Sequence, residues 1–222
     1  MTSMLIPLLD LDGTLYDSLL PAFNLENHLL VKRGHAPVSL GFYQRNLQSM
    51  DWRKLARDMG HPEEEVEEVV EEFGVEYEKL GPSSLIPGAR EVVLEAELAG
   101  EGLYFVTNDT PERVRMKFER DGFVHLLGNV RSPVNGKAQQ LYELAVEFGG
   151  RRVGYFGDMV CDGEEVLAAR EMGAENLEFF AVTHEYAMNT PEMLREYVVR
   201  HADFAHEVES LARIPGLLRN GV

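Results

Sequence analysis

Four short apolar runs constrain the fold of this chain most strongly, because each precedes a polar or glycine-containing turn and then a stretch with helical periodicity. They cover residues 5–9, 103–106, 153–156 and 179–182. Continuous apolar runs of this length are typical of strands buried on both faces of a parallel sheet. Strands that alternate with helices predict an α/β fold with a doubly wound, mostly parallel sheet. In such sheets, ligands bind beyond the carboxyl ends of the strands.

Helical patterns follow or precede these runs. Thr110 is a suitable N-cap, and Pro111 occupies the first position of the helix that it would begin. Gly173 is placed to end another helix. The predicted helices around the sheet cover residues 89–99, 111–120, 137–148 and 164–172.

Residues 17–83 contain no strand-like run and read as a helical module inserted after the first strand. Glycines at 34, 60 and 81 separate the helical stretches. These stretches cover residues 19–33, 39–50, 51–59 and 62–80. We therefore expect a core domain made of residues 1–16 and 84–222, a cap domain made of residues 17–83, and hinges near 16–18 and 81–87.

Composition limits the function classes that the chain can serve. The 222 residues carry a formal net charge of −17, which disfavours binding to nucleic acid or anionic membranes by bulk electrostatics. The single cysteine cannot form an internal disulfide or a cysteine-rich zinc site. The N-terminus lacks the basic region of a signal peptide, and no apolar stretch approaches the roughly 20 residues that span a bilayer. We expect a cytoplasmic protein.

The strongest functional signal is the segment Asp10-Leu11-Asp12-Gly13-Thr14, which directly follows the first apolar run. Residues i and i+2 of a strand share a face, so both carboxylates are expected to point into one crevice. Two carboxylates this close repel each other unless a cation or a proton lies between them. An Asp-Gly pair also marks tight turns, but a turn alone does not explain two acids at the end of a buried strand.

Two shorter segments supply candidate phosphate-binding groups. Thr107 and Asn108 end the second apolar run, where a hydroxyl beside free backbone amides suits a phosphoryl oxygen. Lys137 begins a predicted helix, where the helix dipole disfavours a cation, and that local conflict is a hint of function. Taken alone, the threonine also fits an ordinary strand end, and the lysine fits a surface charge.

A final acidic segment, from Gly157 to Asp162, follows the third apolar run. Asp162 alone could be the N-cap of the following helix, whereas Asp158 has no such structural role. Together with Asp10, Asp158 offers oxygen ligands to a small hard cation such as Mg²⁺.

In their order, the segments Asp-x-Asp-Gly-Thr, Thr, Lys and Gly-Asp-x-x-x-Asp resemble the four motifs of the haloacid dehalogenase (HAD) superfamily. The inserted helical module is similar to the cap of the phosphoglycolate-phosphatase-like branch, and the resemblance spans nearly the whole chain. It implies a HAD-like hydrolase with a Rossmann-like core, a helical cap and Mg²⁺ as cofactor. One departure is that many relatives carry Lys-Pro where this chain has Lys137-Ala138.

The resemblance implies a catalytic role for the first two aspartates. Asp10 would attack phosphorus, form an aspartyl-phosphate and contribute to the metal site. Asp12 would protonate the leaving oxygen and then activate the hydrolytic water, while its backbone carbonyl binds the metal.

The resemblance also implies roles for the later motifs. Thr107, Asn108 and Lys137 would bind the substrate phosphate. Asp158 would be a side-chain ligand of Mg²⁺. Asp162 would act on the metal directly, through water, or by orienting Lys137.

These roles together predict a Mg²⁺-dependent phosphomonoester hydrolase, a phosphatase that acts on a small phosphorylated metabolite. A sugar phosphomutase shares all four motifs and stays open, as does 5′-nucleotidase specificity. A non-catalytic HAD-like binding protein is the contrasting class, which the presence of Asp10 and Asp158 disfavours. Asp12 disfavours a haloacid dehalogenase. We expect no nucleic-acid or membrane partner, and a monomer or homodimer.

Substrate selection would depend on the inserted module. Its aromatic candidates for a substrate contact are Tyr43 and Trp52. Its basic candidates are Lys32, Arg33, Arg45, Arg53, Lys54 and Arg57.

Overall fold

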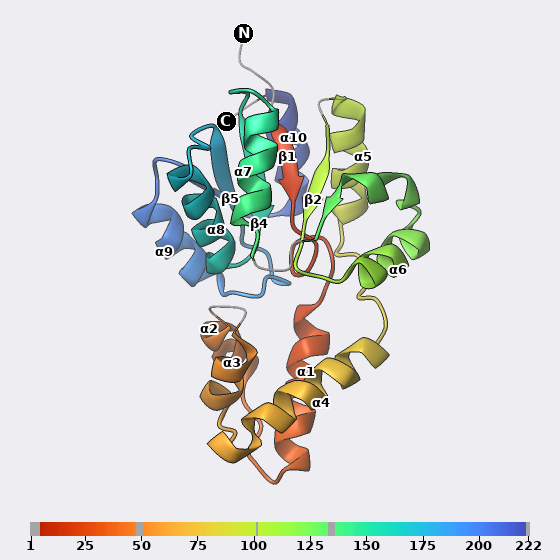
Figure 1. Ribbon diagram of the computed structural model, residues 1–222, viewed down its shortest axis with the longest axis vertical. Coiled ribbons are helices and arrows are strands. Elements are labelled where there is room, and N and C mark those ends of the chain that lie inside the picture. Colours follow the sequence, from red (N-terminus) through yellow and green to blue (C-terminus); the bar gives the residue numbers. More distant parts are fainter. Residues whose placement is uncertain (1–4, 48–50, 101, 133–135, 221–222) are drawn as a thin grey trace.

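A computed structural model describes residues 5–47, 51–100, 102–132 and 136–220 of the chain (Figure 1). Within these residues, six strands form one parallel sheet in the order β3-β2-β1-β4-β5-β6. The predicted α/β class with a doubly wound sheet is therefore confirmed. The strands are β1 (Ile6–Leu9), β2 (Tyr104–Val106), β3 (Val130–Arg131), β4 (Val153–Gly157), β5 (Leu177–Val182) and β6 (Ala205–Val208).

The strand order reverses beside β1. The chain places β2 and then β3 on one side of β1, and it returns to the other side for β4, β5 and β6. A crevice opens at such a reversal, at the carboxyl ends of the two strands that flank it. Asp10 directly follows β1 and Asp158 directly follows β4, so the topology brings the two acidic segments to the same crevice.

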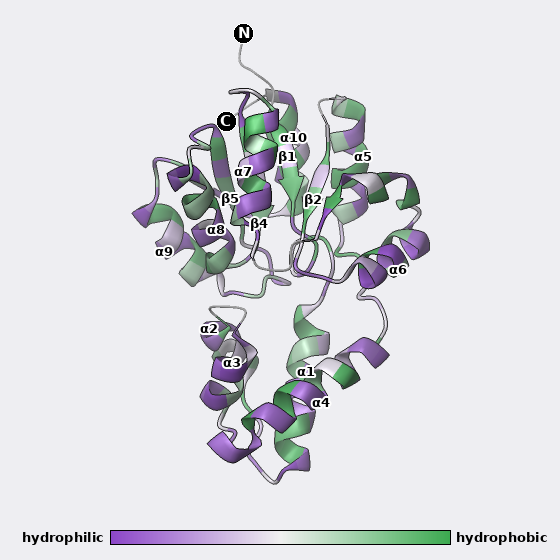
Figure 2. Ribbon diagram, viewed as in Figure 1, coloured by the Kyte–Doolittle hydropathy of each residue, from purple (hydrophilic) through white to green (hydrophobic). Residues whose placement is uncertain are grey.

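Helices cover both faces of the sheet because successive strand residues point to opposite sides. Leu9, Phe105 and Phe156 pack on one face, and Leu8 and Tyr155 pack on the other. Figure 2 shows the apolar central strands and the polar outer stretches of the helices. The first face is covered by α5 (Ala89–Ala99), α6 (Pro111–Asp121) and α10 (Ile214–Asn220), and the second by α7 (Ala138–Glu147), α8 (Val160–Glu171) and α9 (Pro191–Arg200).

Four strands match the predicted apolar runs, whereas the edge strands β3 and β6 were not predicted. β3 has only two residues, and β6 reads Ala-His-Glu-Val, which is not an apolar run. Both become strands by hydrogen bonding to one neighbour, β3 to β2 and β6 to β5. The predicted helix 164–172 was wrong at its start, because α8 begins at Val160. The N-cap of α6 is Thr110, as predicted.

Residues 17–83, called the insert below, form a separate helical group at the carboxyl edge of the sheet (Figure 1). Its helices are α1 (Leu19–Lys32), α2 (Leu40–Asn46), α3 (Trp52–Met59) and α4 (Val66–Lys79), with a 3₁₀ turn at Glu63–Glu65. The helix predicted over 39–50 ends at Asn46, and residues 48–50 lie outside the described part. Among the described helices, none has the length and apolar character needed to cross a membrane.

The chain enters and leaves the insert through two segments that pair with each other. The Asp17 amide donates to the Ser84 carbonyl at 2.9 Å, and the Ile86 amide donates to the Leu15 carbonyl at 2.9 Å. The boundaries expected between core and cap fall on these segments. Hinge motion at this point stays a prediction.

A buried asparagine also ties the insert to the core, the sheet with its flanking helices. The Asn189 side chain is fully buried, and its amide nitrogen donates to the Leu47 carbonyl at 2.6 Å and the Gln44 carbonyl at 3.2 Å. Its side-chain oxygen accepts from the Val160 amide at 2.7 Å. Gln44 in turn donates to the Ala187 carbonyl at 2.9 Å. One side chain thus joins α2, α8 and the loop before α9.

We expect Asn189→Ala to lower the free energy of unfolding by about 2 kcal/mol, because it leaves three buried or partly buried backbone groups without their partner. Chemical denaturation measures this loss. Asn46→Ala is the control, since Asn46 is only half-buried and its side-chain hydrogen bond among the described residues, to the Phe42 carbonyl, lies within its own helix, and its cost should stay within about 0.5 kcal/mol. Equal losses of unfolding free energy in the two variants would contradict the role of Asn189 in tying the insert to the core.

Candidate active site

The loop after β1 is shaped by its close approach to Asp158. Gly13 has a φ of +77°, and a Cβ atom there would lie 2.1 Å from Asp158 Oδ2, so only glycine fits this position. The Thr14 hydroxyl donates to Asp158 Oδ1 at 2.8 Å. The Gly-Thr pair of the first motif therefore serves to seat the loop against the acidic segment after β4.

A pocket of about 210 Å³ lies between this loop region and the insert. Asp158 lies outside its lining and is fully buried. The other predicted site residues all line the pocket: Asp10, Asp12, Thr107, Asn108, Lys137 and Asp162. Four segments that are far apart in the sequence thus meet at one cavity.

Asp10 is buried at the bottom of the crevice, beside the only cation among the pocket-lining residues. Its Oδ1 lies 3.0 Å from Lys137 Nζ. Burial raises the pKa of Asp10 to about 7, and the charge of Asp162 adds to this rise while Lys137 opposes it. Without a further cation, Asp10 therefore holds a proton more readily than an ordinary carboxyl.

Lys137 is held as a buried cation. Its Nζ donates to Asp162 Oδ1 at 2.8 Å and to the Tyr155 hydroxyl at 2.7 Å. Burial lowers the pKa of Lys137, but Asp10 and Asp162 outweigh burial and hold that pKa well above its ordinary value. The lysine is thus charged across the physiological range.

Glu165 binds the backbone amides of Lys137 and Ala138, the pair at which the third motif departs from Lys-Pro. Its Oε2 accepts from the Lys137 amide at 3.0 Å and from the Ala138 amide at 2.7 Å. These are free amides at the start of α7, where a carboxylate is favourable. A carboxylate from α8 therefore fixes the backbone at Lys137, which sequence reasoning did not foresee.

The acidic residues fit a divalent cation. Asp10, Asp158 and Asp162 are buried and each offer an oxygen, all within 4.8 Å of one another. Burial raises the pKa of Asp158 well above its usual range, and Asp162 and Asp10 add to the rise. Oxygen donors with this excess of negative charge match the preference of Mg²⁺. Asp10 and Asp158 would hold it.

Asp162 is turned toward the protein. Its Oδ1 accepts from Lys137, and its Oδ2 accepts from the Met159 amide at 3.1 Å. It is the third residue of α8 and not its N-cap, because the helix begins two residues earlier, at Val160. The bond to Lys137 is the contact that the predicted orienting role requires, and a metal contact of Asp162, directly or through water, stays a prediction.

Asp12 has a different environment from Asp10. Its Oδ1 lies 2.6 Å from Lys117 Nζ and also accepts from the Ser18 hydroxyl. Burial raises the pKa of Asp12, but Lys117, with the help of Ser18 and Arg113, outweighs burial and holds that pKa below its usual value. The Asp12 carboxylate is outside the acidic cluster. A metal contact through its backbone carbonyl stays a prediction.

Lys117 is a site residue that sequence reasoning missed. It is fully buried and also lies 2.7 Å from Asp109, another pocket residue. The available signal was its position on α6, beside Val114 and Phe118 on the buried face. A lysine on the apolar face of a helix is rarely fully buried unless it is paired.

The second motif lies at the pocket wall. Thr107 is buried, and its hydroxyl accepts from the Asp109 amide at 3.1 Å. Asn108 is exposed and lines the same pocket. Phosphate binding by these two residues stays a prediction.

Comparisons by sequence and by structure give different results. No protein-family model matches the chain, and no curated protein matches it significantly. Solved structures do match it over nearly the whole length. A haloacid dehalogenase-like hydrolase from Streptococcus pneumoniae superposes with a TM-score of 0.75 at 16% identity, covering 99% of this chain and 100% of the other.

Two further structures are similar to the chain at 20% identity, each with a TM-score of 0.70 and 99% coverage of both chains. One is a HAD family hydrolase from Deinococcus radiodurans with bound phosphate and sodium. The other is a predicted phosphoglycolate phosphatase from Haemophilus somnus. The expected HAD-like fold is therefore confirmed.

We expect Asp158→Asn to raise the Tm of the metal-free protein at pH 8 by about 3 °C, the shift that about 1 kcal/mol produces at this size. Asparagine keeps partners for Thr14 and the Met188 amide, which bind the present carboxylate, and it removes the buried charge. Because the pKa of Asp158 is higher in the folded than in the unfolded protein, the wild type loses stability as the pH rises through the folded-state pKa. At about pH 4 the carboxyl is protonated in the folded protein, so the gain from Asp158→Asn should vanish there. Thermal unfolding across this pH range measures it.

Asp203→Asn is the matched control for this experiment, because Asp203 is exposed and precedes β6 at the opposite edge of the sheet. Mg²⁺ should raise the Tm of the wild type and of this control, and it should not raise the Tm of Asp158→Asn. A Tm of Asp158→Asn below that of the wild type at pH 8 would contradict the analysis.

Lys117→Met should lower the free energy of unfolding at pH 7 by about 3 kcal/mol, since it leaves Asp12 and Asp109 without their buried partner. Lys117 lowers the pKa of Asp12 in the folded protein, and a lowered pKa stabilises the fold at pH values above the unfolded pKa of the group. This stabilisation is lost as the pH falls, so the difference between the variant and the wild type should shrink below about pH 4. Denaturant titrations at both pH values measure it. Lys79→Met removes an exposed pair with Glu76 and should cost about 0.5 kcal/mol or less.

Proposed function

We propose that this protein is a Mg²⁺-dependent phosphatase that hydrolyses a small phosphomonoester through a phosphoaspartyl intermediate at Asp10. The observation that carries the proposal is the buried Asp10 carboxylate, 3.0 Å from Lys137 Nζ and within a cluster of three aspartates that fits a hard cation. Phosphate is bound in the structurally similar hydrolase from Deinococcus radiodurans, which supports the same chemistry. We expect the enzyme to act in the cytoplasm as a monomer or homodimer.

In the first step, a carboxylate oxygen of Asp10 attacks phosphorus in line with the ester oxygen. The Asp10–phosphorus bond forms, the bond to the ester oxygen breaks, and Asp12 gives a proton to the leaving alcohol. Lys137 offsets the repulsion between the carboxylate and the phosphoryl group. When bound, Mg²⁺ supplies the remaining positive charge for the phosphoryl oxygens.

In the second step, water attacks the phosphorus of the phosphoaspartate. Asp12 takes one proton from this water, the Asp10–phosphorus bond breaks, and inorganic phosphate is released. The Lys117 ammonium, 2.6 Å from Asp12, favours the carboxylate form that this step needs. Asp12 holds this proton only transiently, because Lys117 favours its carboxylate form, and it must be protonated again when the next leaving alcohol departs. The insert limits access of bulk water to the pocket during these steps.

Phosphate release is the test of this proposal. The panel contains sugar phosphates, phosphoglycolate, nucleotides and aryl phosphates, each with Mg²⁺ and with a chelator. Asp10→Asn should lower kcat by about a thousandfold or more, because the amide is a poor nucleophile. Asp203→Asn, the same change at an exposed position, should leave kcat unchanged.

The other outcomes of this panel identify the competing functions. Interconversion of two sugar phosphates without phosphate release would indicate a phosphomutase. A best rate on nucleotides would indicate a nucleotidase. Ligand binding with no turnover by the folded wild type would indicate a binding protein and would refute the phosphatase.

A further inference from the structure

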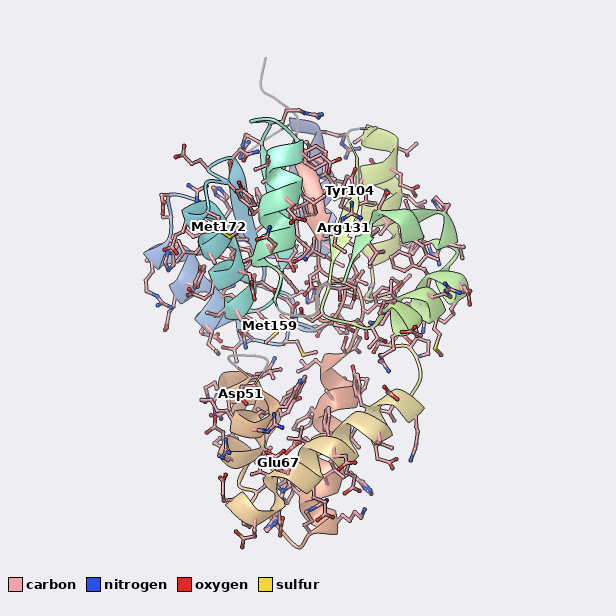
Figure 3. The ribbon with its side chains drawn as sticks, viewed as in Figure 1. Asp51, Glu67, Tyr104, Arg131, Met159 and Met172 are labelled. Atoms are coloured by element: carbon pink, nitrogen blue, oxygen red, sulfur yellow. The ribbon has the colours of Figure 1, made fainter. Side chains whose placement is uncertain are left out.

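The part of the pocket that faces away from Asp10 is apolar. From the insert, it is lined by Ala22, Tyr43, Leu47, Trp52, Phe73 and Tyr77. From the core, Met159, Cys161 and Met188 also line it, and Figure 3 shows Met159 at the edge of the core that faces the insert. All of these side chains are uncharged. The pocket therefore joins a charged phosphate end to an apolar end.

Three aromatic rings form a stacked row along this apolar wall. The ring centroids of Trp52 and Phe73 are 5.5 Å apart with planes at 27°, and those of Phe73 and Tyr77 are 5.7 Å apart with planes at 11°. Such a wall favours a further ring in an offset-stacked or edge-to-face arrangement. The buried Tyr43 hydroxyl has no hydrogen-bond partner among the described residues.

No cation lines the apolar end for a second anionic group. Arg113 lies 4.6 Å over the Tyr77 ring, but it is outside the pocket lining and is paired with Asp109 at 3.0 Å. None of the six basic residues proposed from the sequence lines the pocket. Arg53 is 2.6 Å from Glu67, and Arg57 is 2.6 Å from Glu63. Lysine, arginine and histidine are also missing from the positions outside the described part of the chain.

The one lining cation, Lys137, already contacts Asp10 and Asp162. A carboxylate at the far end of a substrate would exchange water for apolar walls without gaining a partner, which is costly. An uncharged ring would gain from burial at the same position.

The volume limits the size of the occupant. A dry cavity of about 150 Å³ holds one benzene molecule, and this pocket has about 210 Å³. The space suits one six-membered ring attached to a phosphoryl group.

We propose that the substrate is the phosphomonoester of an uncharged alcohol that carries a single aromatic ring. The ring would pack against Trp52 and Phe73 while the phosphoryl group lies at Asp10 and Lys137. This inference depends on the proposed function only for the position of the phosphoryl group. The preference for an uncharged ring follows from the side chains that line the apolar end.

The test compares two esters that differ by one charge. Benzyl phosphate and 4-carboxybenzyl phosphate have similar leaving groups, and only the second carries a carboxylate at the apolar end. With Mg²⁺ present, we expect kcat/KM for benzyl phosphate to exceed that for 4-carboxybenzyl phosphate and for phosphoglycolate by about tenfold or more. Equal or reversed values would overturn the proposal.

Substitutions in the aromatic wall test whether the preference for benzyl phosphate arises there. Phe73→Ala should raise KM for benzyl phosphate by about tenfold while KM for glycerol phosphate changes little. Phe73→Leu keeps an apolar side chain for packing within the insert, and it should raise KM about threefold. Val75→Ala is the control, because Val75 is exposed on the same helix. Unchanged KM values in both Phe73 variants would overturn the proposal.

A binding measurement separates this inference from the proposed function. Benzylphosphonate and 4-carboxybenzylphosphonate cannot be hydrolysed at the carbon–phosphorus bond, so calorimetry with Mg²⁺ reports on the pocket alone. If no ester is hydrolysed but benzylphosphonate binds about tenfold more tightly, the catalytic proposal fails and this inference stands. If the two bind equally, or neither binds, the inference fails whatever the result of the activity assay.

Discussion

The structure depends on a buried group of charges at the point where β1 and β4 lie side by side. Asp10, Asp158 and Asp162 meet there with a single ammonium, that of Lys137. An excess of buried negative charge is unfavourable in a low dielectric, and the raised pKa values of Asp10 and Asp158 express this cost. The neighbouring groups reduce it, since Thr14 and the Met188 amide donate to Asp158. A site of this kind is built to accept a cation.

The two aspartates of the first motif share a pocket but differ in protonation chemistry. Asp10 lies in the acidic cluster, where burial raises its pKa to about 7. Asp12 lies beside Lys117, which holds its pKa below the usual value despite burial. Opposite shifts in neighbouring carboxyls are a physical means of giving them different roles. Lys117 is therefore central to the site, although it belongs to none of the four motifs.

The predictions succeeded where a local pattern carries the information and failed where partners decide. The apolar runs identified β1, β2, β4 and β5, which are buried on both faces. The edge strands β3 and β6 have no such run and exist through pairing with one neighbour. In the insert, the helices were foreseen, but none of the basic candidates lines the pocket, and Arg53, for example, pairs with Glu67 instead.

The sequence by itself determined the α/β class, the helical insert and the residues at the carboxyl ends of the strands, because each of these is encoded within a few consecutive positions. Only the tertiary structure decided the partners. Lys117 meets Asp12 across 105 positions of the chain, and Glu165 binds the backbone amide of Lys137 across 28. The apolar wall that faces the phosphate site also arises only where the insert meets the core. Periodicity records which face of an element is buried, whereas the choice of neighbour depends on how the elements pack.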